Sequence, residues 1–144
     1  MLIVVDTNVL LVSVSSRSKY HWLYRLTLDK KVDIAFSNDI LIEYEEQLSI
    51  HWHPDVAINV IRSITELSSA QLTTIYYNLH LITVDEDDNK FVDCAFAANA
   101  DFIITNDSHF NVLKNIDFPS IPILLIDEFR KLLEELNILS YDSR

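Results

Sequence analysis

The chain has 144 residues, of which 49% are hydrophobic, and a formal net charge of −11. This length and composition predict a globular domain with a substantial core, and the charge argues against a generic nucleic-acid binder, which is normally basic. The sequence contains no glycine, which excludes phosphate-binding loops of the Walker A and GxGxxG types. Its single cysteine, Cys94, excludes an internal disulfide and fits a reducing cytosol.

The sequence shows no segment that is typical of a membrane-spanning helix or a signal peptide. No apolar run approaches the roughly 20 residues that a membrane-spanning helix needs. The first residues, MLIVVDTNV, lack the basic region and the cleavage site of a signal peptide. We therefore expect a cytoplasmic protein with no membrane association.

Short apolar and β-branched runs predict five strands, which cover residues 1–5, 32–36, 80–84, 102–105 and 121–126. Apolar residues at helical spacing predict helices between them, at about residues 18–30, 39–48, 56–67, 91–98 and 129–136. Strands that alternate with helices predict an α/β fold with a mainly parallel five-stranded sheet flanked by helices. We expect residues 1–139 to form one domain and residues 140–144 to form a polar tail.

Acidic residues follow four of the five predicted strands. Asp6 comes directly after the first, Glu43 lies on the helix after the second, Asp88 ends an acidic run after the third, and Asp107 follows the fourth. Parallel sheets bind ligands beyond the carboxyl ends of their strands. We assign these acids no lysine partner, and crowded carboxylates without counter-charges need cations. Hard divalent ions supply that charge and support phosphodiester hydrolysis, so a metal site is expected at this edge.

Each acid also has an ordinary structural explanation. Asp6 could cap the following helix, Glu43 belongs to an acidic run that could be a solvated face, and Asp107 could be a turn residue. The acids at residues 85–88 could complement the dipole of the next helix. These explanations are reasonable singly, but together they require four coincidences at one edge of the sheet.

Four segments of the sequence together resemble the PIN-domain ribonucleases, and most closely the bacterial and archaeal branch of toxin components of toxin–antitoxin systems. The segments are IVVDTNVLLVS, NDILIEYEEQL, DEDDNKFVDCAFAANADFIITNDSHF and IPILLIDEFRKLL. The resemblance covers nearly the whole chain, in order. It implies the PIN-like three-layer sandwich.

The resemblance also implies which residues form the site. It assigns catalysis and the binding of one or two Mg²⁺ or Mn²⁺ ions to Asp6, Glu43, Asp88 and Asp107, and Asp93 stands where this branch often has a further acid. It assigns supporting roles to Thr7, Asn8, Thr105 and Asn106. The family often has glycine where this chain has Asn106, so we expect Asn106 to adopt the left-handed conformation that asparagine tolerates.

The acids predict metal-dependent phosphodiester hydrolysis, and the resemblance implies an endonuclease that cleaves single-stranded RNA as the toxin of a toxin–antitoxin pair. The expected partners are the RNA substrate, a small antitoxin protein and a second copy of the chain in a homodimer. Arg17 and Lys19, which follow the first motif, are the candidate contacts to RNA phosphates. Two alternatives stay open: a catalytically weak PIN-fold protein that binds RNA or regulates, and a DNA-directed nuclease.

Overall fold

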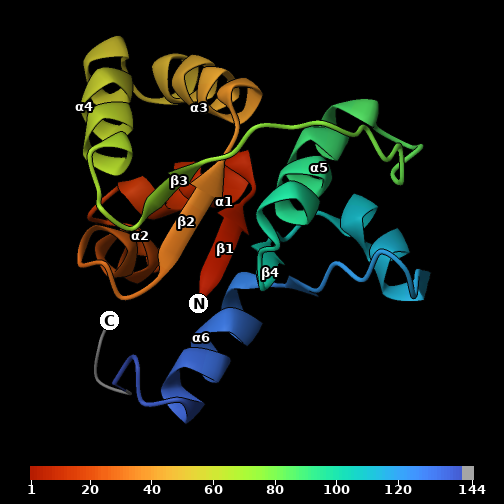
Figure 1. The fold of residues 1–144 in the computed structure, drawn as a ribbon. Coiled ribbons are helices and arrows are strands. Elements are labelled where there is room, and N and C mark those ends of the chain that lie inside the picture. Colours follow the sequence, from red (N-terminus) through yellow and green to blue (C-terminus); the bar gives the residue numbers. More distant parts are fainter. Residues whose placement is uncertain (141–144) are drawn as a thin grey trace.

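The structure is a computed structural model that describes residues 1–140. Five parallel strands form one sheet in the order β3-β2-β1-β4-β5, with β1 at its centre (Figure 1). The strands are β1 (Leu2–Val5), β2 (Asp33–Phe36), β3 (Ala70–Leu72), β4 (Phe102–Ile104) and β5 (Ile123–Leu124). Of the tail expected at residues 140–144, all but Ser140 lies outside the described residues.

Helices connect the strands. Two pairs lie between β1 and β3: α1 (Thr7–Val14), α2 (His21–Leu28), α3 (Asn38–His51) and α4 (Pro54–Thr65). The second half contains the 3₁₀ helix η1 (Glu86–Asp88), α5 (Asn89–Ala98), the 3₁₀ helix η2 (Ser108–Asn115) and α6 (Ile126–Glu135). None of the helices in residues 1–140 is both long and apolar enough to cross a bilayer.

The sheet is covered on both faces. Ile3 and Val4 are successive residues of β1, so their side chains point to opposite faces, and both are completely buried. Right-handed crossovers place α1 to α4 on one face and α5 on the other. Trp22 of α2 packs against Phe129 of α6, with their ring centroids 6.3 Å apart. The expected three-layer α/β fold is therefore confirmed.

Local sequence signals explain where the longer helices begin and end. The Ser37 hydroxyl accepts a hydrogen bond from the backbone N–H of Ile40 at the start of α3. Pro54 opens α4, where its missing N–H costs nothing. Asn99 ends α5 in the left-handed conformation, with φ at 52°. Glu128 accepts a hydrogen bond from the Leu125 N–H at the start of α6.

The third strand was predicted in the wrong place. Residues 80–84 form no strand, and the third strand is the short, half-exposed β3 at the edge of the sheet. Ile82 is completely buried, which explains the strand-like apolar run. Its backbone N–H and carbonyl, however, form hydrogen bonds with a side chain instead of with a neighbouring strand. The Asn89 amide accepts from the Ile82 N–H at 2.9 Å and donates to the Ile82 carbonyl at 2.8 Å.

Two further predictions differ from the structure at their boundaries. The fifth strand was expected at residues 121–126, but β5 covers only Ile123–Leu124, because Pro122 lacks a backbone donor and Ile126 already begins α6. No helix was expected directly after the first strand, where α1 lies. This helix is apolar on most sides and buried, so it lacks the amphipathic pattern that identifies surface helices.

Replacing Asn89 with alanine is expected to destabilise the protein by about 2 to 4 kcal/mol, because the buried N–H and carbonyl of Ile82 would both lose their partner. Urea unfolding monitored by tryptophan fluorescence measures this change. Asn111→Ala is the matched control, because Asn111 is exposed on η2. Equal stability of the two variants would mean that the amide does not anchor residues 73–85.

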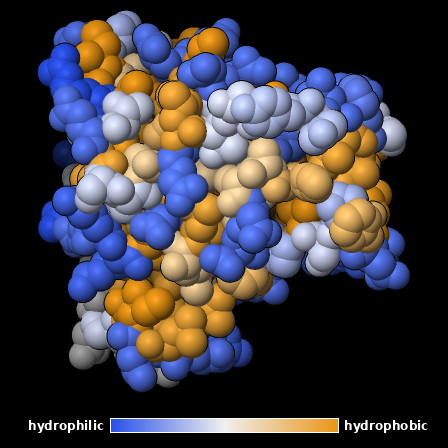
Figure 2. Space-filling model, viewed as in Figure 1, coloured by the Kyte–Doolittle hydropathy of each residue, from blue (hydrophilic) through white to orange (hydrophobic). Residues whose placement is uncertain are grey.

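The surface mixes hydrophilic and apolar side chains. Figure 2 shows the two kinds interspersed over one face, with a large apolar group where α6 lies. The core itself is continuous and includes the strands and one side of each helix. The fold thus presents the carboxyl ends of a rigid sheet as the base for a polar site.

Candidate active site

Asp6 and Asp107 meet at the carboxyl ends of the two neighbouring strands β1 and β4. Asp6 precedes α1, but its side chain makes no capping hydrogen bond, so the capping explanation does not hold. Instead, the Thr105 hydroxyl donates to Asp6 Oδ2 at 2.8 Å and accepts from the Asp107 N–H at 3.0 Å. One buried hydroxyl therefore fixes both acids relative to each other.

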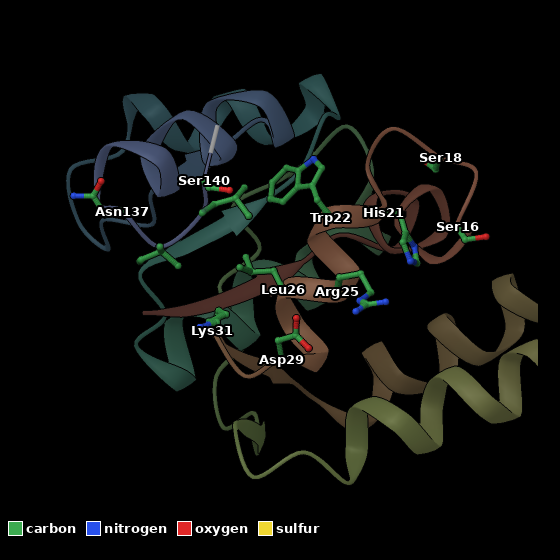
Figure 3. A pocket seen from close by; sticks show the side chains of 12 residues that line it. Ser16, Ser18, His21, Trp22, Arg25, Leu26, Asp29, Lys31, Asn137 and Ser140 are labelled. Carbon is green, nitrogen blue, oxygen red and sulfur yellow. The ribbon is translucent and has the colours of Figure 1, made fainter. Parts of the chain in front are cut away.

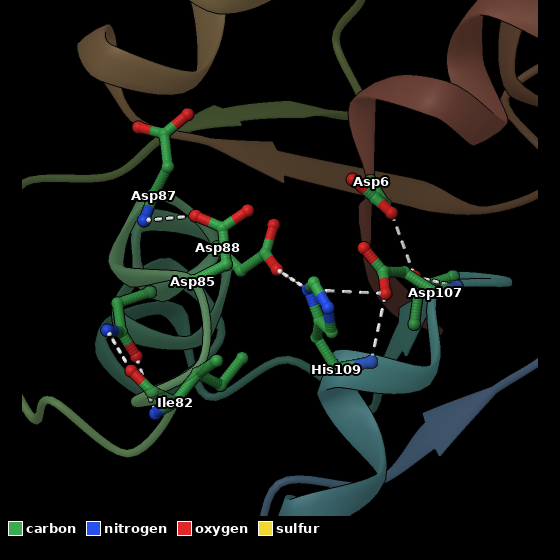
Figure 4. Close-up of polar contacts among 9 residues, drawn as sticks. Asp6, Ile82, Asp85, Asp87, Asp88, Asp107 and His109 are labelled. Atoms are coloured by element: carbon green, nitrogen blue, oxygen red, sulfur yellow. Dashed lines mark hydrogen bonds and ion pairs between the residues drawn. The ribbon is translucent and has the colours of Figure 1, made fainter.

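Asp88 reaches the same place from η1 and the start of α5. Its Oδ2 lies 3.1 Å from His109 Nδ1, and the same nitrogen lies 3.5 Å from Asp107 Oδ1. Figure 4 shows His109 between the acids of residues 85–88 and Asp107. We assigned His109 no role from the sequence, where its position two residues after Asp107 is the only signal.

Burial and neighbouring charges shift the pKa values of Asp6 and Asp88. Burial, together with the charges of Asp88 and Asp107, raises the pKa of Asp6 to about 6, although the Thr105 hydrogen bond opposes this change. Burial also raises the pKa of Asp88, opposed by the His109 hydrogen bond and reinforced by the charges of Asp85 and Asp107. The structure thus links Asp6 to Asp107 through Thr105 and Asp107 to Asp88 through His109, although Asp88 does not follow a strand directly.

Glu43 lies beside this group with both carboxylate oxygens occupied. The Thr7 hydroxyl donates to Oε2, and Lys90 Nζ lies 2.8 Å from Oε1. Lys90 also lies 2.9 Å from Asp87 Oδ1. The prediction that these acids have no lysine partner was thus wrong, because α5 turns Lys90 back toward α3.

The ion pairs of Lys90 with Glu43 and Asp87 shift the pKa values of Lys90 and Asp87. Burial lowers the pKa of Lys90, but hydrogen bonds to Glu43 and Asp87 outweigh burial and raise the pKa overall. The Lys90 hydrogen bond lowers the pKa of Asp87. Glu45 and Glu46, which spacing could not separate from Glu43, are exposed.

Asp93 lies apart from these acids, beside residues 73–85. Its Oδ1 accepts a hydrogen bond from the Leu79 N–H at 3.0 Å, and it is 6% exposed. Burial raises the pKa of Asp93, and the Leu79 hydrogen bond opposes this change. In the structure Asp93 therefore anchors the segment that runs along α5.

Asn106 does not adopt the left-handed conformation that we expected. The described non-glycine residues with positive φ are Lys30, His80, Asn99 and Asn137. The Asn106 side chain instead accepts a hydrogen bond from the Ile126 N–H at 3.1 Å, at the start of α6. An amide oxygen is needed there, which explains asparagine in place of glycine, and Thr105 sets the direction of Asp107.

A cavity of about 290 Å³ opens beside Asp6 and Asp107, and Asn8 and Tyr20 line it. The Lys19 ammonium lies 4.9 Å from the centre of the Tyr20 ring, so the loop that carries Arg17 and Lys19 leads toward this cavity. A larger cavity of about 660 Å³ lies between α2 and the residues after α6 (Figure 3). It contains none of the candidate acids.

The donor set fits a hard divalent cation. Asp6, Asp88 and Asp107 supply carboxylate oxygens, and Asp6 is 5% exposed without a cationic partner among the described residues. Asp85, Asp88 and His109 form an adjoining group whose ligand atoms lie within 4.8 Å of one another. Asp88 belongs to this compact group, whereas Asp6 and Asp107 lie outside it, and a cation bound at Asp88 would relieve the repulsion among the neighbouring carboxylates.

The family follows from a comparison along the chain. Residues 2–109 match the profile of the PIN-domain family. The chain belongs to the PIN-domain family. This match includes Asp6, Glu43, Asp88 and Asp107, so all four candidate acids of this PIN-domain protein lie inside the matched region.

Solved structures of two PIN-fold proteins are similar to this chain. One is VapBC2 from Rickettsia felis bound to a DNA fragment from its promoter, with a TM-score of 0.60, 19% identity, and 87% of this chain and 98% of that chain covered. The other is VapC20 from Mycobacterium tuberculosis, described as a toxin that cleaves the sarcin–ricin loop, with a TM-score of 0.57 and 16% identity, covering 76% and 92%. At these identities the similarity concerns the fold. No match to a curated protein reaches significance.

Proposed function

We propose that this PIN-domain protein is a metal-dependent endoribonuclease that cleaves single-stranded RNA. The observation that carries the proposal is that Asp6 and Asp107 share the Thr105 hydroxyl while Asp88 and Asp107 share His109 Nδ1, which links acids from three separate elements. Burying carboxylates of the same charge near one another destabilises the folded state, and a functional role as metal ligands would explain why the chain keeps them there. Membership of the PIN-domain family supports nuclease activity.

The proposed roles follow from the contacts. Asp6, Asp88 and Asp107 would hold a Mg²⁺ or Mn²⁺ ion, and Thr105 and His109 keep these acids in place. Glu43 adds a fourth carboxylate, which Thr7 holds by a hydrogen bond next to Asp6 in the chain. Asp93 would act indirectly, by holding the segment around Leu79 against α5. A bound divalent ion supplies an activated water and charge stabilisation for phosphodiester hydrolysis. Asn8 and Tyr20 line the cavity where an RNA strand would lie, and Arg17 and Lys19 would contact its phosphates.

We further propose that the protein acts as the toxin of a toxin–antitoxin pair in the cytoplasm. Its fold similarity to the toxin VapC20, and to VapBC2, supports this role. Residues 1–139 would act as one PIN domain, which forms a homodimer and binds a small antitoxin protein. A net charge of −11 suits a basic partner surface.

Cleavage assays on matched RNA and DNA oligonucleotides test the proposal. We expect the purified protein to cleave single-stranded RNA with Mn²⁺ or Mg²⁺, and to lose this activity when a chelator removes the ion. Cleavage should weaken as the salt concentration rises, because salt screens the attraction between RNA phosphates and the few cationic residues near the site.

Each alternative function has its own outcome in these assays. Preferential cleavage of DNA would replace the proposal with a DNA-directed nuclease. Binding of RNA without cleavage under any metal condition would indicate a regulatory RNA-binding protein. Cleavage that persists in the chelator would show that the acidic residues do not act through a metal ion.

A further inference from the structure

Lys90 gives the acidic edge a positive charge of its own. Its ammonium touches Glu43 and Asp87, and the side chains of Lys90 and Glu43 are each only 18% exposed. These residues line a hollow of about 480 Å³ together with Asp39 and Glu46. Four acids and one lysine therefore surround this hollow, next to the acids of the candidate metal site.

Glu43 has no free oxygen for a metal ion in this arrangement. Thr7 donates to one carboxylate oxygen and Lys90 to the other. A direct metal bond would require Glu43 to give up one of these donors. Asp6, by contrast, accepts one side-chain hydrogen bond, from Thr105, and Asp88 and Asp107 are paired with a histidine.

We propose that the Lys90 ammonium takes the place of a second divalent ion at Glu43, so that the site takes one Mg²⁺ or Mn²⁺ ion. This inference rests on the proposed function. A fixed ammonium neutralises Glu43 and repels a second cation, and the pair is screened weakly because it is largely buried. The single ion would be held by Asp6, Asp88 and Asp107, none of which contacts Lys90 in the part of the chain that the structure describes.

Removing the ammonium should therefore create a second ion site. In Lys90→Met, the hollow keeps its four acids and loses its cation, so Glu43 Oε1 and Asp87 Oδ1 both lose their ammonium partner. Carboxylates in such an arrangement bind Mn²⁺. Lys90→Arg keeps the positive charge and should leave the hollow without an ion.

Isothermal titration of the metal-free, full-length protein with Mn²⁺ measures the number of ions per chain. We expect one ion for the wild type and for Lys90→Arg, and two ions for Lys90→Met. Lys114→Met is the matched control, because it removes the same charge from an exposed position on η2 and should still bind one ion. Circular dichroism establishes that each variant is folded.

Several results would overturn the inference. Two ions on the wild type would show that Lys90 does not exclude the second ion, and one ion on folded Lys90→Met would show that its charge is not the reason. If Lys90→Met does not fold, Glu43→Gln decides: we expect it to bind one Mn²⁺ with affinity reduced by no more than about tenfold. Loss of that ion would make Glu43 a ligand. If the wild type binds no Mn²⁺ at all, this result would instead contradict the proposed metal-dependent nuclease function.

Discussion

Replacing Asp6 or Asp107 with asparagine is expected to lower RNA cleavage roughly 10²- to 10³-fold, the loss typical of removing one group that stabilises charge in the transition state. Asparagine keeps the size of the side chain and can still accept the Thr105 hydrogen bond at position 6. It removes the negative charge that a divalent ion needs. The loss should therefore appear in the rate at saturating RNA while the fold is kept.

The measurement is single-turnover cleavage of a fluorescent RNA at fixed Mn²⁺, with circular dichroism on each variant. Asp117→Asn is the control, because Asp117 is exposed and outside the site. It should cleave at the wild-type rate. Folded Asp6→Asn and Asp107→Asn proteins that cleave as fast as wild type would falsify the assignment of these acids to catalysis.

The same Asp6→Asn substitution is expected to stabilise the metal-free protein by about 1 to 3 kcal/mol at pH 7.5. The pKa of Asp6 is raised from 3.8 to about 6, chiefly by burial. Above pH 6 the folded state must therefore keep a charged carboxylate that the unfolded state solvates better. Function and stability thus make opposite demands at this position.

The pH dependence has a defined sign. Because the folded state has the higher pKa, the wild type gains stability from Asp6 as the pH falls through 6, and asparagine has no such gain. The advantage of Asp6→Asn should therefore shrink between pH 7.5 and 4.5. Urea unfolding in the presence of a chelator measures it at both values.

Metal addition provides the complementary measurement. Mn²⁺ should stabilise the wild type at pH 7.5, because an ion that binds only the folded state shifts the unfolding equilibrium. Asp6→Asn should respond much less. In the chelator, a stability difference between the wild type and Asp6→Asn that stays constant from pH 7.5 to 4.5 would show that the charge of Asp6 does not destabilise the metal-free protein.

The fold could be predicted largely from apolar patterning. The buried strands β1, β2 and β4 were identifiable because their residues are apolar except for Asp33 at the start of β2, which is typical of a parallel sheet covered on both faces. The edge strand β3 was missed because it is short and half exposed. Residues 80–84 were mistaken for a strand because burial of Ile82 resembles strand burial, whereas its hydrogen bonds come from Asn89.

The candidate site was predictable for a different reason. Asp6 and Asp107 directly follow buried parallel strands, whose carboxyl ends must lie at one edge of the sheet, so chain order alone brings them together. Asp88 was identified by family resemblance and its acidic neighbours, although its route to the site, through residues 73–85 and η1, was not foreseen.

What the sequence by itself determined was the class of the fold, the family, and the placement of Asp6 and Asp107 after neighbouring parallel strands, because each depends on residues near one another in the chain or on strand order. The tertiary structure alone decided the partners of those acids. Lys90 reaches Glu43 across 47 residues, His109 meets Asp88 across 21, and Asn106 turns toward Ile126. Such contacts depend on how helices dock against the sheet, and a few degrees of helix rotation would give each side chain another partner.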